Sequence, residues 1–150
     1  ASKAYLAATA LEEGADELDM VINIGALKDR DYHTVGQEID AIAALKQEYR
    51  FILKVIIETA FLSVEELAEL IILINQTEAD FVKTSTGFGP RGASLEDIAN
   101  IIKHKRPSLK IKASGGIRDL DLALAMIEAG ADRLGTSSAG QLLADYQARP

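Results

Sequence analysis

The segment ELDMVINI, residues 17–24, is a short run of mainly apolar residues that follows the turn-forming sequence EGAD at 13–16. Comparable runs return four times along the chain, as FILKVIIE (51–58), ADFVKTST (79–86), LKIKASGG (109–116) and ADRLGTSS (131–138). Each run predicts a strand. Between the runs, apolar residues recur at helical spacing, over 35–45, 64–71, 95–102 and 122–126. Strands that alternate with helices in this way predict an α/β fold with a parallel sheet.

The boundaries of the predicted helices carry ordinary structural signals. Ser63 with Glu66 three residues later resembles a capping box, and Ser94 with Asp97 is a weaker version of it. The similar endings EEGAD (12–16) and EAGAD (128–132) place a glycine after a helix, where a left-handed cap is easily adopted. No low-complexity linker or charge block divides the chain, so we predict one domain over residues 1–150.

Two architectures fit alternating strands and helices: an open doubly wound sheet and a βα barrel. Each predicted strand ends in polar or small residues, and chemistry that is spread over several strand ends is typical of a barrel. An open nucleotide-binding sheet instead concentrates recognition in one glycine-rich loop, and neither GxGxxG nor GxxxxGK[ST] occurs in this sequence. The pattern therefore favours a barrel, although a complete barrel has eight units and about 250 residues.

Composition excludes several classes of function. The 150 residues include 16 basic and 23 acidic side chains, and the net charge of −7 disfavours nonspecific binding to nucleic acid or to an anionic membrane. The absence of cysteine excludes thiol catalysis and thiolate metal sites. His33 and His104 have no other ligands at metal spacing, so we expect neither a metal nor a cofactor. Without a membrane-length apolar run or an export signal, we expect a cytoplasmic protein.

Three lysines, Lys54, Lys83 and Lys112, stand in the middle of apolar strands, where an unpaired ammonium group is costly. Each is either paired with a carboxylate such as Asp19 or Glu58, or is an amine held near other cations in a partly dry pocket. An amine of the second kind is the nucleophile that a Schiff-base enzyme needs. Asp19 is correspondingly either a structural ion-pair partner or a proton shuttle. The residues alone leave open which lysine reacts.

The small residues after the last three strands are candidates for binding an anion. Residues 84–87, 114–116 and 135–138 combine glycine with serine or threonine, so backbone N–H groups and hydroxyls can approach a phosphate closely. Arg91 is either a surface residue or a group that reaches an anion from a mobile loop.

Taken together, five strings resemble the deoxyribose-phosphate aldolase family, which consists of class I aldolases on a (β/α)8 TIM barrel. They are GADELDMVINIGALK (14–28), LKVIIET (53–59), ADFVKTSTGFG (79–89), KASGGIR (112–118) and GTSS (135–138), and the resemblance covers residues 12–140. It implies a partial barrel that contains only strands 4–8 with their helices. The implied reaction cleaves 2-deoxy-D-ribose 5-phosphate to D-glyceraldehyde 3-phosphate and acetaldehyde through a lysine imine.

The same resemblance assigns roles to individual residues. It implies that Lys83 forms the Schiff base, that Lys112 is the second lysine whose charge favours the neutral amine, and that Asp19 transfers protons. Lys54 would help to orient Asp19. The positions that match the family's phosphate site are Gly87, Gly115, Gly116, Ser137 and Ser138.

Alternatives of two classes remain open. One is another class I aldolase or a transaldolase-like enzyme for a different phosphorylated sugar, and the other is a noncatalytic phosphate-binding fragment or self-assembling partial barrel. Because five strands do not close a barrel that needs eight, we expect the chain to form a homo-oligomer or to require an N-terminal barrel segment. By itself it is expected to be weakly active.

Overall fold

Five parallel strands and seven α-helices alternate along residues 2–149, the part of the chain that the computed structural model describes. The strands are β1 (Glu17–Val21), β2 (Ile52–Ile56), β3 (Phe81–Lys83), β4 (Lys110–Ser114) and β5 (Arg133–Gly135). The helices are α1 (Ser2–Glu12), α2 (Ile24–Lys28), α3 (Tyr32–Ala43), α4 (Val64–Ile74), α5 (Leu95–His104), α6 (Leu120–Glu128) and α7 (Ala139–Gln147), with 3-10 turns at Ala44–Gln47 and Thr59–Phe61. The predicted α/β fold is therefore confirmed.

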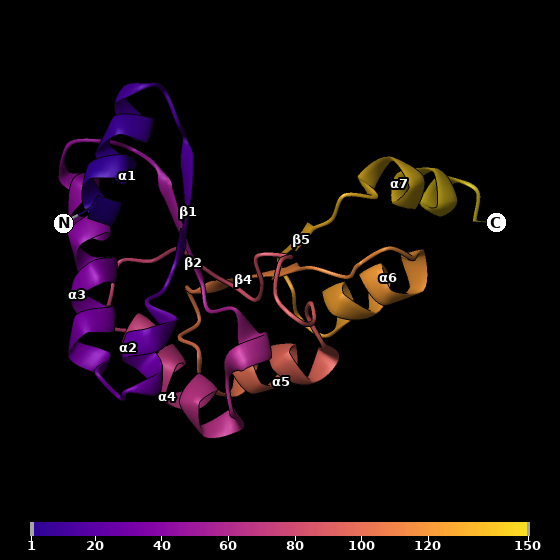
Figure 1. The fold of residues 1–150 in the computed structure, drawn as a ribbon. Coiled ribbons are helices and arrows are strands. Elements are labelled where there is room, and N and C mark those ends of the chain that lie inside the picture. The colour runs from indigo at the N-terminus through magenta and orange to yellow at the C-terminus, as the bar shows by residue number, and fades with distance from the viewer. Residues whose placement is uncertain (1, 150) are drawn as a thin grey trace.

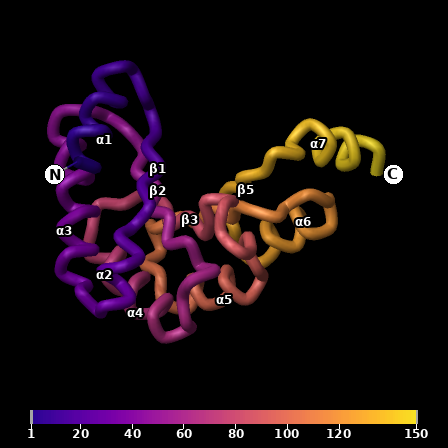
Figure 2. Tube along the Cα trace, viewed as in Figure 1, coloured from indigo at the N-terminus to yellow at the C-terminus, as the bar shows by residue number. Residues whose placement is uncertain are grey.

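The strands lie in the order of the sequence, β1-β2-β3-β4-β5, and each pair is parallel. Helices α3 to α6 follow one side of this curved sheet, whereas the other side is open between β1 and α7 (Figures 1 and 2). A doubly wound sheet would reverse its strand order and carry helices on both faces. The arrangement is thus the wall of a βα barrel, as the sequence predicts.

Alternation along the strands separates a dry face from a polar one. Leu53, Val55, Val82, Ile111 and Ala113 are fully buried and belong to the core under the helices. The residues between them include the three strand lysines, which therefore lie on the opposite, open face of the sheet. Burial of the core face positions the lysine face, because a one-residue slip of register would exchange the two.

The ends of the helices agree with their sequence signals. Both capping boxes form, with Ser63 and Glu66 at α4 and with Ser94 and Asp97 at α5. The glycines after α1 and α6, Gly14 and Gly130, adopt left-handed φ values of 96° and 110°. No helix within residues 2–149 is long and apolar enough to cross a membrane.

The first predicted strand, residues 17–24, extends beyond the observed strand β1. Strand β1 ends at Val21, because the Asn23 side chain accepts a hydrogen bond from the Ala26 amide (3.0 Å) and caps the short helix α2. Asparagine competes for backbone hydrogen bonds in this way at helix starts. Ile22 still donates its amide to the Ile56 carbonyl (3.1 Å), and the chain leaves the sheet at Asn23.

Candidate active site

Asp19 is the centre of a charged cluster on the open face of the sheet. Its Oδ2 lies 2.7 Å from Lys83 Nζ and 3.6 Å from Lys112 Nζ, and its Oδ1 lies 2.8 Å from Lys54 Nζ. Strand register produces this grouping, since Asp19 is opposite Lys54 and Lys83 is opposite Lys112. The structure thus brings together all four residues that the sequence analysis named for catalysis.

The lysines hold Asp19 ionised. Burial opposes its ionisation, but hydrogen bonds from Lys54 and Lys83 outweigh that effect and lower the pKa of Asp19 to about 2. Burial has the opposite consequence for the neighbouring cation. It lowers the pKa of Lys112, and the charges of Lys83 and Lys54 act in the same direction against the attraction of Asp19. The cluster therefore combines an ionised carboxylate, Asp19, with an amine, that of Lys112, which loses its proton more easily than the amine of an exposed lysine.

A second ion-pair group supports the first from the strand starts. Glu17, two residues before Asp19, lies 2.9 Å from Lys54 Nζ and 2.5 Å from the Arg133 guanidinium. Hydrogen bonds from Arg133 and then from Lys54 lower the pKa of Glu17 to about 2. Arg133 also stacks on the Phe81 ring, 5.0 Å from its centroid. Glu17 and Arg133 are not among the predicted site residues, although the spacing Glu-x-Asp puts Glu17 on the same face as Asp19.

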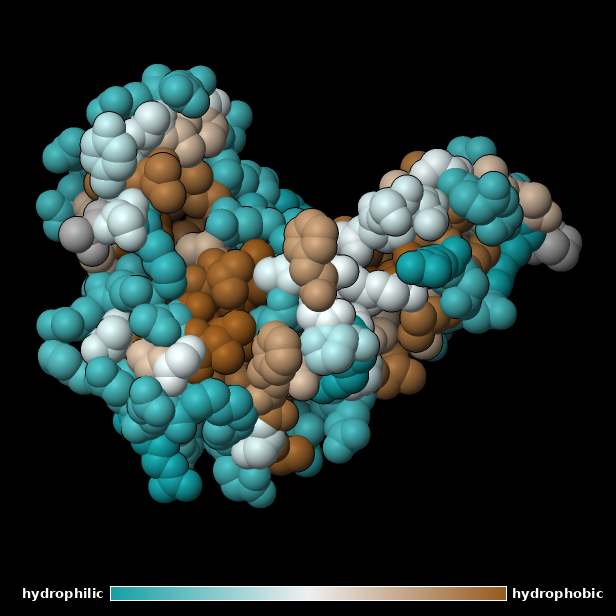
Figure 3. All heavy atoms as spheres, in the orientation of Figure 1, coloured by the Kyte–Doolittle hydropathy of each residue, from teal (hydrophilic) through white to brown (hydrophobic). Residues whose placement is uncertain are grey.

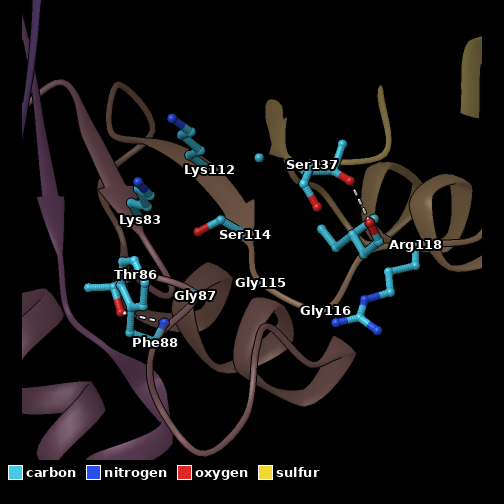
Figure 4. Close-up of a pocket in the computed structure, with 13 residues that line it drawn as sticks. Lys83, Thr86, Gly87, Phe88, Lys112, Ser114, Gly115, Gly116, Arg118 and Ser137 are labelled. Atoms are coloured by element: carbon cyan, nitrogen blue, oxygen red, sulfur yellow. Dashed lines mark hydrogen bonds between the residues drawn. The ribbon is translucent and has the colours of Figure 1, made fainter. Parts of the chain in front are cut away.

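A cavity of about 360 Å³ extends from the partly buried amines of Lys83 and Lys112 to the strand ends (Figure 4). Lys83 and Lys112 lie side by side on neighbouring strands at one end of it. The rest of the lining comes from the last residues of β4 and β5 and from the loops after β3, β4 and β5, with Thr86, Gly87, Phe88, Ser114, Gly115, Gly116, Ile117, Arg118, Gly135, Thr136 and Ser137. An anionic group that occupied the loop end would leave the other end of the ligand near the amines.

Four of the five residues predicted to hold phosphate line this cavity: Gly87, Gly115, Gly116 and Ser137. The three glycines have φ values between 75° and 94°, a region that side-chain-bearing residues rarely adopt. Ser138 is not among the lining residues, and its amide donates to Thr136 Oγ1 at 2.9 Å. Arg118 lines the cavity and was not singled out from the sequence, although it ends the motif KASGGIR.

Several hydroxyls near the cavity are engaged inside the protein. Thr84 Oγ1 accepts from the Ser114 amide (3.0 Å), and Ser114 Oγ donates to the Ser85 carbonyl (2.6 Å). Thr84 and Ser85 are fully buried. These bonds join the ends of β3 and β4 and fix the two strands that carry Lys83 and Lys112. In this part of the loop, the predicted anion-binding hydroxyls instead hold the scaffold together.

Two glycines, Gly135 and Gly92, allow close packing around the cavity. A Cβ atom on Gly135 of β5 would lie 2.9 Å from Ser114 Cβ and 3.3 Å from Lys112 Cε. Any larger residue would therefore press on the side chain of Lys112. A Cβ on Gly92 would lie 2.0 Å from the Gly115 carbonyl oxygen, so the loop after β3 can approach the turn after β4 only because Gly92 is a glycine.

Arg91 fastens the loop after β3. Its guanidinium binds both carboxylate oxygens of Asp97, at 2.6 and 3.0 Å, and donates to the Thr59 carbonyl at 3.2 Å. The side chain is half exposed, but its charge is committed to Asp97, which is almost fully buried. Arg91 is thus an anchor of the loop in this structure. No group of three or more His, Cys, Asp or Glu side chains that could hold a metal occurs within residues 2–149.

Several proteins of known identity are similar to this chain in sequence or in structure. No protein-family model matches the chain. Two curated proteins named deoxyribose-phosphate aldolase are similar to it. The one from Thermococcus gammatolerans is 54% identical over 136 residues, which are 91% of this chain and 60% of the relative. The one from Thermus thermophilus is 49% identical over 142 residues, which are 95% of this chain and 64% of the relative. The chain thus spans about three fifths of these relatives.

Solved structures agree with the curated relatives. An aldolase described as "QR15, an Aldolase" superposes with a TM-score of 0.88 at 43% identity, over 97% of this chain and 67% of that one. The tetrameric deoxyribose phosphate aldolase of Aeropyrum pernix superposes with a TM-score of 0.84 at 34% identity, over 95% of this chain and 59% of that one. Sequence and structure together establish that this chain belongs to the deoxyribose-phosphate aldolase family.

Proposed function

We propose that residues 1–150 form an aldolase domain that carries a class I reacting site, in which Lys83 forms a Schiff base with 2-deoxy-D-ribose 5-phosphate. The products are D-glyceraldehyde 3-phosphate and acetaldehyde. One observation carries the proposal: an amine at a cavity wall lies 2.7 Å from an ionised carboxylate and is flanked by two further lysines. Schiff-base catalysis needs such an amine beside other cations and a group that moves protons.

The surroundings of the three lysines favour Lys83 and Lys112 over Lys54. Lys54 is 3% exposed, is paired with both Glu17 and Asp19, and does not line the cavity. We assign it to the orientation of Asp19. Between the other two, the family motif favours Lys83 as the nucleophile, and its shorter distance to Asp19 supports that choice. Because the pKa of Lys112 is lowered, an experiment must exclude Lys112 directly.

The chemistry follows from the electron demands of an imine. The neutral Lys83 amine attacks the C1 carbonyl carbon of the open-chain sugar, and the resulting carbinolamine loses water to give an iminium ion. A base removes the proton of the C3 hydroxyl, and the electron pair of the C2–C3 bond moves into the iminium, which becomes an enamine. The phosphorylated aldehyde leaves. The enamine then takes a proton at C2, and water releases acetaldehyde and the free amine.

Asp19 and Lys112 are the proposed proton carriers for these steps. In the resting cluster Asp19 faces ammonium groups that hold its pKa near 2. When Lys83 becomes a neutral carbinolamine, Asp19 loses one of these partners, so its basicity rises at the step at which a proton has to move. Lys112 can donate a proton more easily than an exposed lysine, because its pKa is lowered.

We place the phosphate of the substrate at the loop end of the cavity. Gly87, Gly115 and Gly116 would offer backbone N–H groups, Ser137 a hydroxyl, and Arg118 a positive charge. This arrangement explains how an acidic protein can bind an anionic substrate locally. Ser138, whose amide donates to Thr136, would contribute only its hydroxyl or a rearranged amide.

Reductive trapping tests the proposal. The full chain is treated with acetaldehyde and borohydride, and the ethylated peptide is mapped. We expect modification of Lys83 and its loss in Lys83→Met. Lys110→Met, which changes an exposed lysine of the same strand as Lys112, is the matched control and should trap as the parent does. Modification of Lys112 or Lys54 with Lys83 untouched would overturn the assignment, and an unmodified chain would favour a noncatalytic phosphate-binding module.

A further inference from the structure

Glu58, two residues after the end of β2, has a backbone and a side chain that are both unusual. Its φ is 40°, in the left-handed region, although it is not a glycine. Its side chain is charged, yet the residue is only 3% exposed. Strained backbone and buried charge each cost free energy and persist where the surroundings enforce them. Such outliers concentrate at functional sites, so Glu58 requires an explanation beyond packing.

The contacts of Glu58 lead directly to the cavity wall. Its Oε2 accepts a short hydrogen bond from the Thr86 hydroxyl and a second bond from the Thr86 amide at 3.2 Å. Thr86 Oγ1 in turn accepts from the Phe88 amide at 3.1 Å. The chain of bonds therefore spans Gly87, the left-handed glycine at the cavity, and determines which way the peptide groups on either side of it point.

The other carboxylate oxygen makes the cost larger. Glu58 Oε1 is buried and has no hydrogen-bond partner among the described residues. A Cβ atom on Gly89 would lie only 2.8 Å from it, so a larger residue at position 89 would displace the carboxylate. An unpaired buried acceptor is expensive. The hydrogen bonds from Thr86 to Oε2 thus form while Oε1 stays unpaired, and this arrangement lowers the stability of the folded chain.

The backbone on both sides of Glu58 is tied to the strand of Lys83. The Ile57 amide donates to the Lys83 carbonyl at 3.0 Å, and the Thr59 amide donates to the Thr84 carbonyl at 2.8 Å. These bonds hold the left-handed kink in place and point the side chain under the loop. Glu58 is therefore fixed with respect to Lys83, and Thr86 is fixed with respect to Glu58.

The far end of the same loop has separate anchors. Arg91 is bound to Asp97, and the Ala93 amide donates to the Ser114 carbonyl at 3.0 Å. Loss of the Glu58 contact would leave these anchors intact. Because these anchors do not use the Glu58 side chain, we expect such a loss to act mainly on the turn at 86–88.

We propose that Glu58 is a positioning residue for anion binding, which acts through Thr86 to set the conformation of the Gly87 turn. This inference rests on the proposed function, because it assumes that the phosphate lies at Gly87. Glu58 itself does not touch the ligand in this scheme. Glu58 does not line the cavity, and its Oε2 accepts both hydrogen bonds from Thr86, which does line it.

Two variants and two controls test the proposal. Thr86→Val removes the hydroxyl donor at nearly constant volume, and Glu58→Gln removes the charge at constant shape. Thr86→Ser keeps the hydroxyl and should therefore bind phosphate as the parent chain does. Glu66→Gln removes a capping carboxylate of α4 that does not line the cavity and is the matched control for charge. For each full-length variant, the dissociation constant for inorganic phosphate is measured by calorimetry, and the rate of acetaldehyde trapping and the melting temperature are recorded.

We expect Thr86→Val and Glu58→Gln to weaken phosphate binding roughly tenfold, as for loss of a hydrogen bond to a charged group. The trapping rate should fall by a factor at least several times smaller, because acetaldehyde carries no phosphate. Equal losses in both readouts, or failure of Thr86→Ser to rescue, would overturn the proposal, as would a parent chain that does not bind phosphate. A parent that binds phosphate but traps no acetaldehyde would instead refute the proposed aldolase site and leave the role of Glu58 supported by the phosphate measurements.

Discussion

At the scale of single residues, the charges on the open face of the sheet are balanced through shared partners. Asp19 forms ion pairs with three lysines, and Glu17 forms ion pairs with Lys54 and Arg133. Each carboxylate has a pKa near 2 as a result. Removal of any one member therefore changes the charge state or orientation of several others. Single substitutions in the cluster should act on both chemistry and stability, and in different proportions.

Lys112→Met separates these two effects. Burial lowers the pKa of Lys112, so its charged form is disfavoured in the folded chain. We therefore expect the free energy of unfolding to be unchanged or slightly higher in the variant. Imine trapping at neutral pH should fall roughly a hundredfold, the typical effect of losing a proton carrier. Urea unfolding and trapping kinetics measure the two quantities, with Lys110→Met as the control. Parent-like trapping at every pH would contradict the assigned role.

Acid should remove the stabilisation that Asp19 provides. The pKa of Asp19 is about 2 in the folded chain and 3.8 ordinarily, so the folded state binds fewer protons between these values. Its contribution to stability is complete above about pH 4 and is lost as the pH falls towards 2. Urea midpoints measured from pH 5 to pH 2 should decline less steeply in Asp19→Asn than in the parent. The same slope in both proteins would show that Asp19 is not protected from protonation.

Residue identity was predictable from the sequence where a polar side chain interrupts an apolar strand. Lys54, Lys83, Lys112 and Asp19 all stand out in this way, and the structure brings them together. Glu58 was named only as a carboxylate that a lysine could pair with, and this interpretation is wrong in the described structure, where it binds Thr86. Its left-handed backbone has no signature in the sequence, because the strain is imposed by contacts with β3.

At the scale of elements, the two capping boxes look alike in sequence but differ in their surroundings. Glu66 of α4 lies at the surface and also pairs with Lys28. Asp97 of α5 is 5% exposed and also binds Arg91 and the Thr59 hydroxyl, which lies at 2.9 Å. The first box stabilises one helix start, whereas the second joins α5 to the loop after β3 and to the end of β2.

Asp97→Ala should therefore cost more than Glu66→Ala. The first change leaves the half-exposed Arg91 guanidinium and a buried hydroxyl without their partner, which should cost about 2 kcal/mol. The second removes part of an exposed cap, worth about 1 kcal/mol. Urea unfolding of both variants gives the comparison. Equal costs would mean that the Arg91 anchor adds nothing to the stability of the loop.

Element order was predictable from hydrophobic periodicity, but element ends were less so. The strand runs at 51–58 and 79–86 extend beyond the observed β2 and β3. After β3, Thr86 leaves the sheet to line the cavity, whereas after β2 Glu58 adopts a left-handed φ. Periodicity reports which face is buried, and it does not report where backbone pairing stops. Side-chain caps such as Asn23 decide that point locally.

At the scale of the whole molecule, the sheet is covered on one side only within the described residues. Strands β1 and β5 each pair with a single neighbour. Apolar side chains gather on the viewed face below α1 and again beneath α7 (Figure 3). Tyr5 and Leu6 on α1, together with Leu143 and Tyr146 on α7, are each at least 60% exposed. Unpaired edges and exposed apolar groups of this kind favour association.

We therefore expect the 150-residue chain to self-associate in solution. Sedimentation velocity over a range of concentrations should detect species larger than a monomer, and Leu143→Lys should shift the distribution towards the monomer. Val64→Lys, on α4 at the outer side of the sheet and 50% exposed, is the matched control and should leave the distribution unchanged. A monomer at every concentration would contradict this expectation.

The Glu17–Arg133 pair has a consequence for the order of events in folding. The two residues are 116 positions apart, and they join the first strand to the last across the curve of the sheet. The backbone pairings between strands link neighbours in the sequence of elements, so they can form one after another, each closing a shorter loop. The bridge between β1 and β5 has to wait until all of them are in place. It belongs to the native side of the folding transition state, and its removal by Arg133→Met should accelerate unfolding while leaving the refolding rate almost untouched.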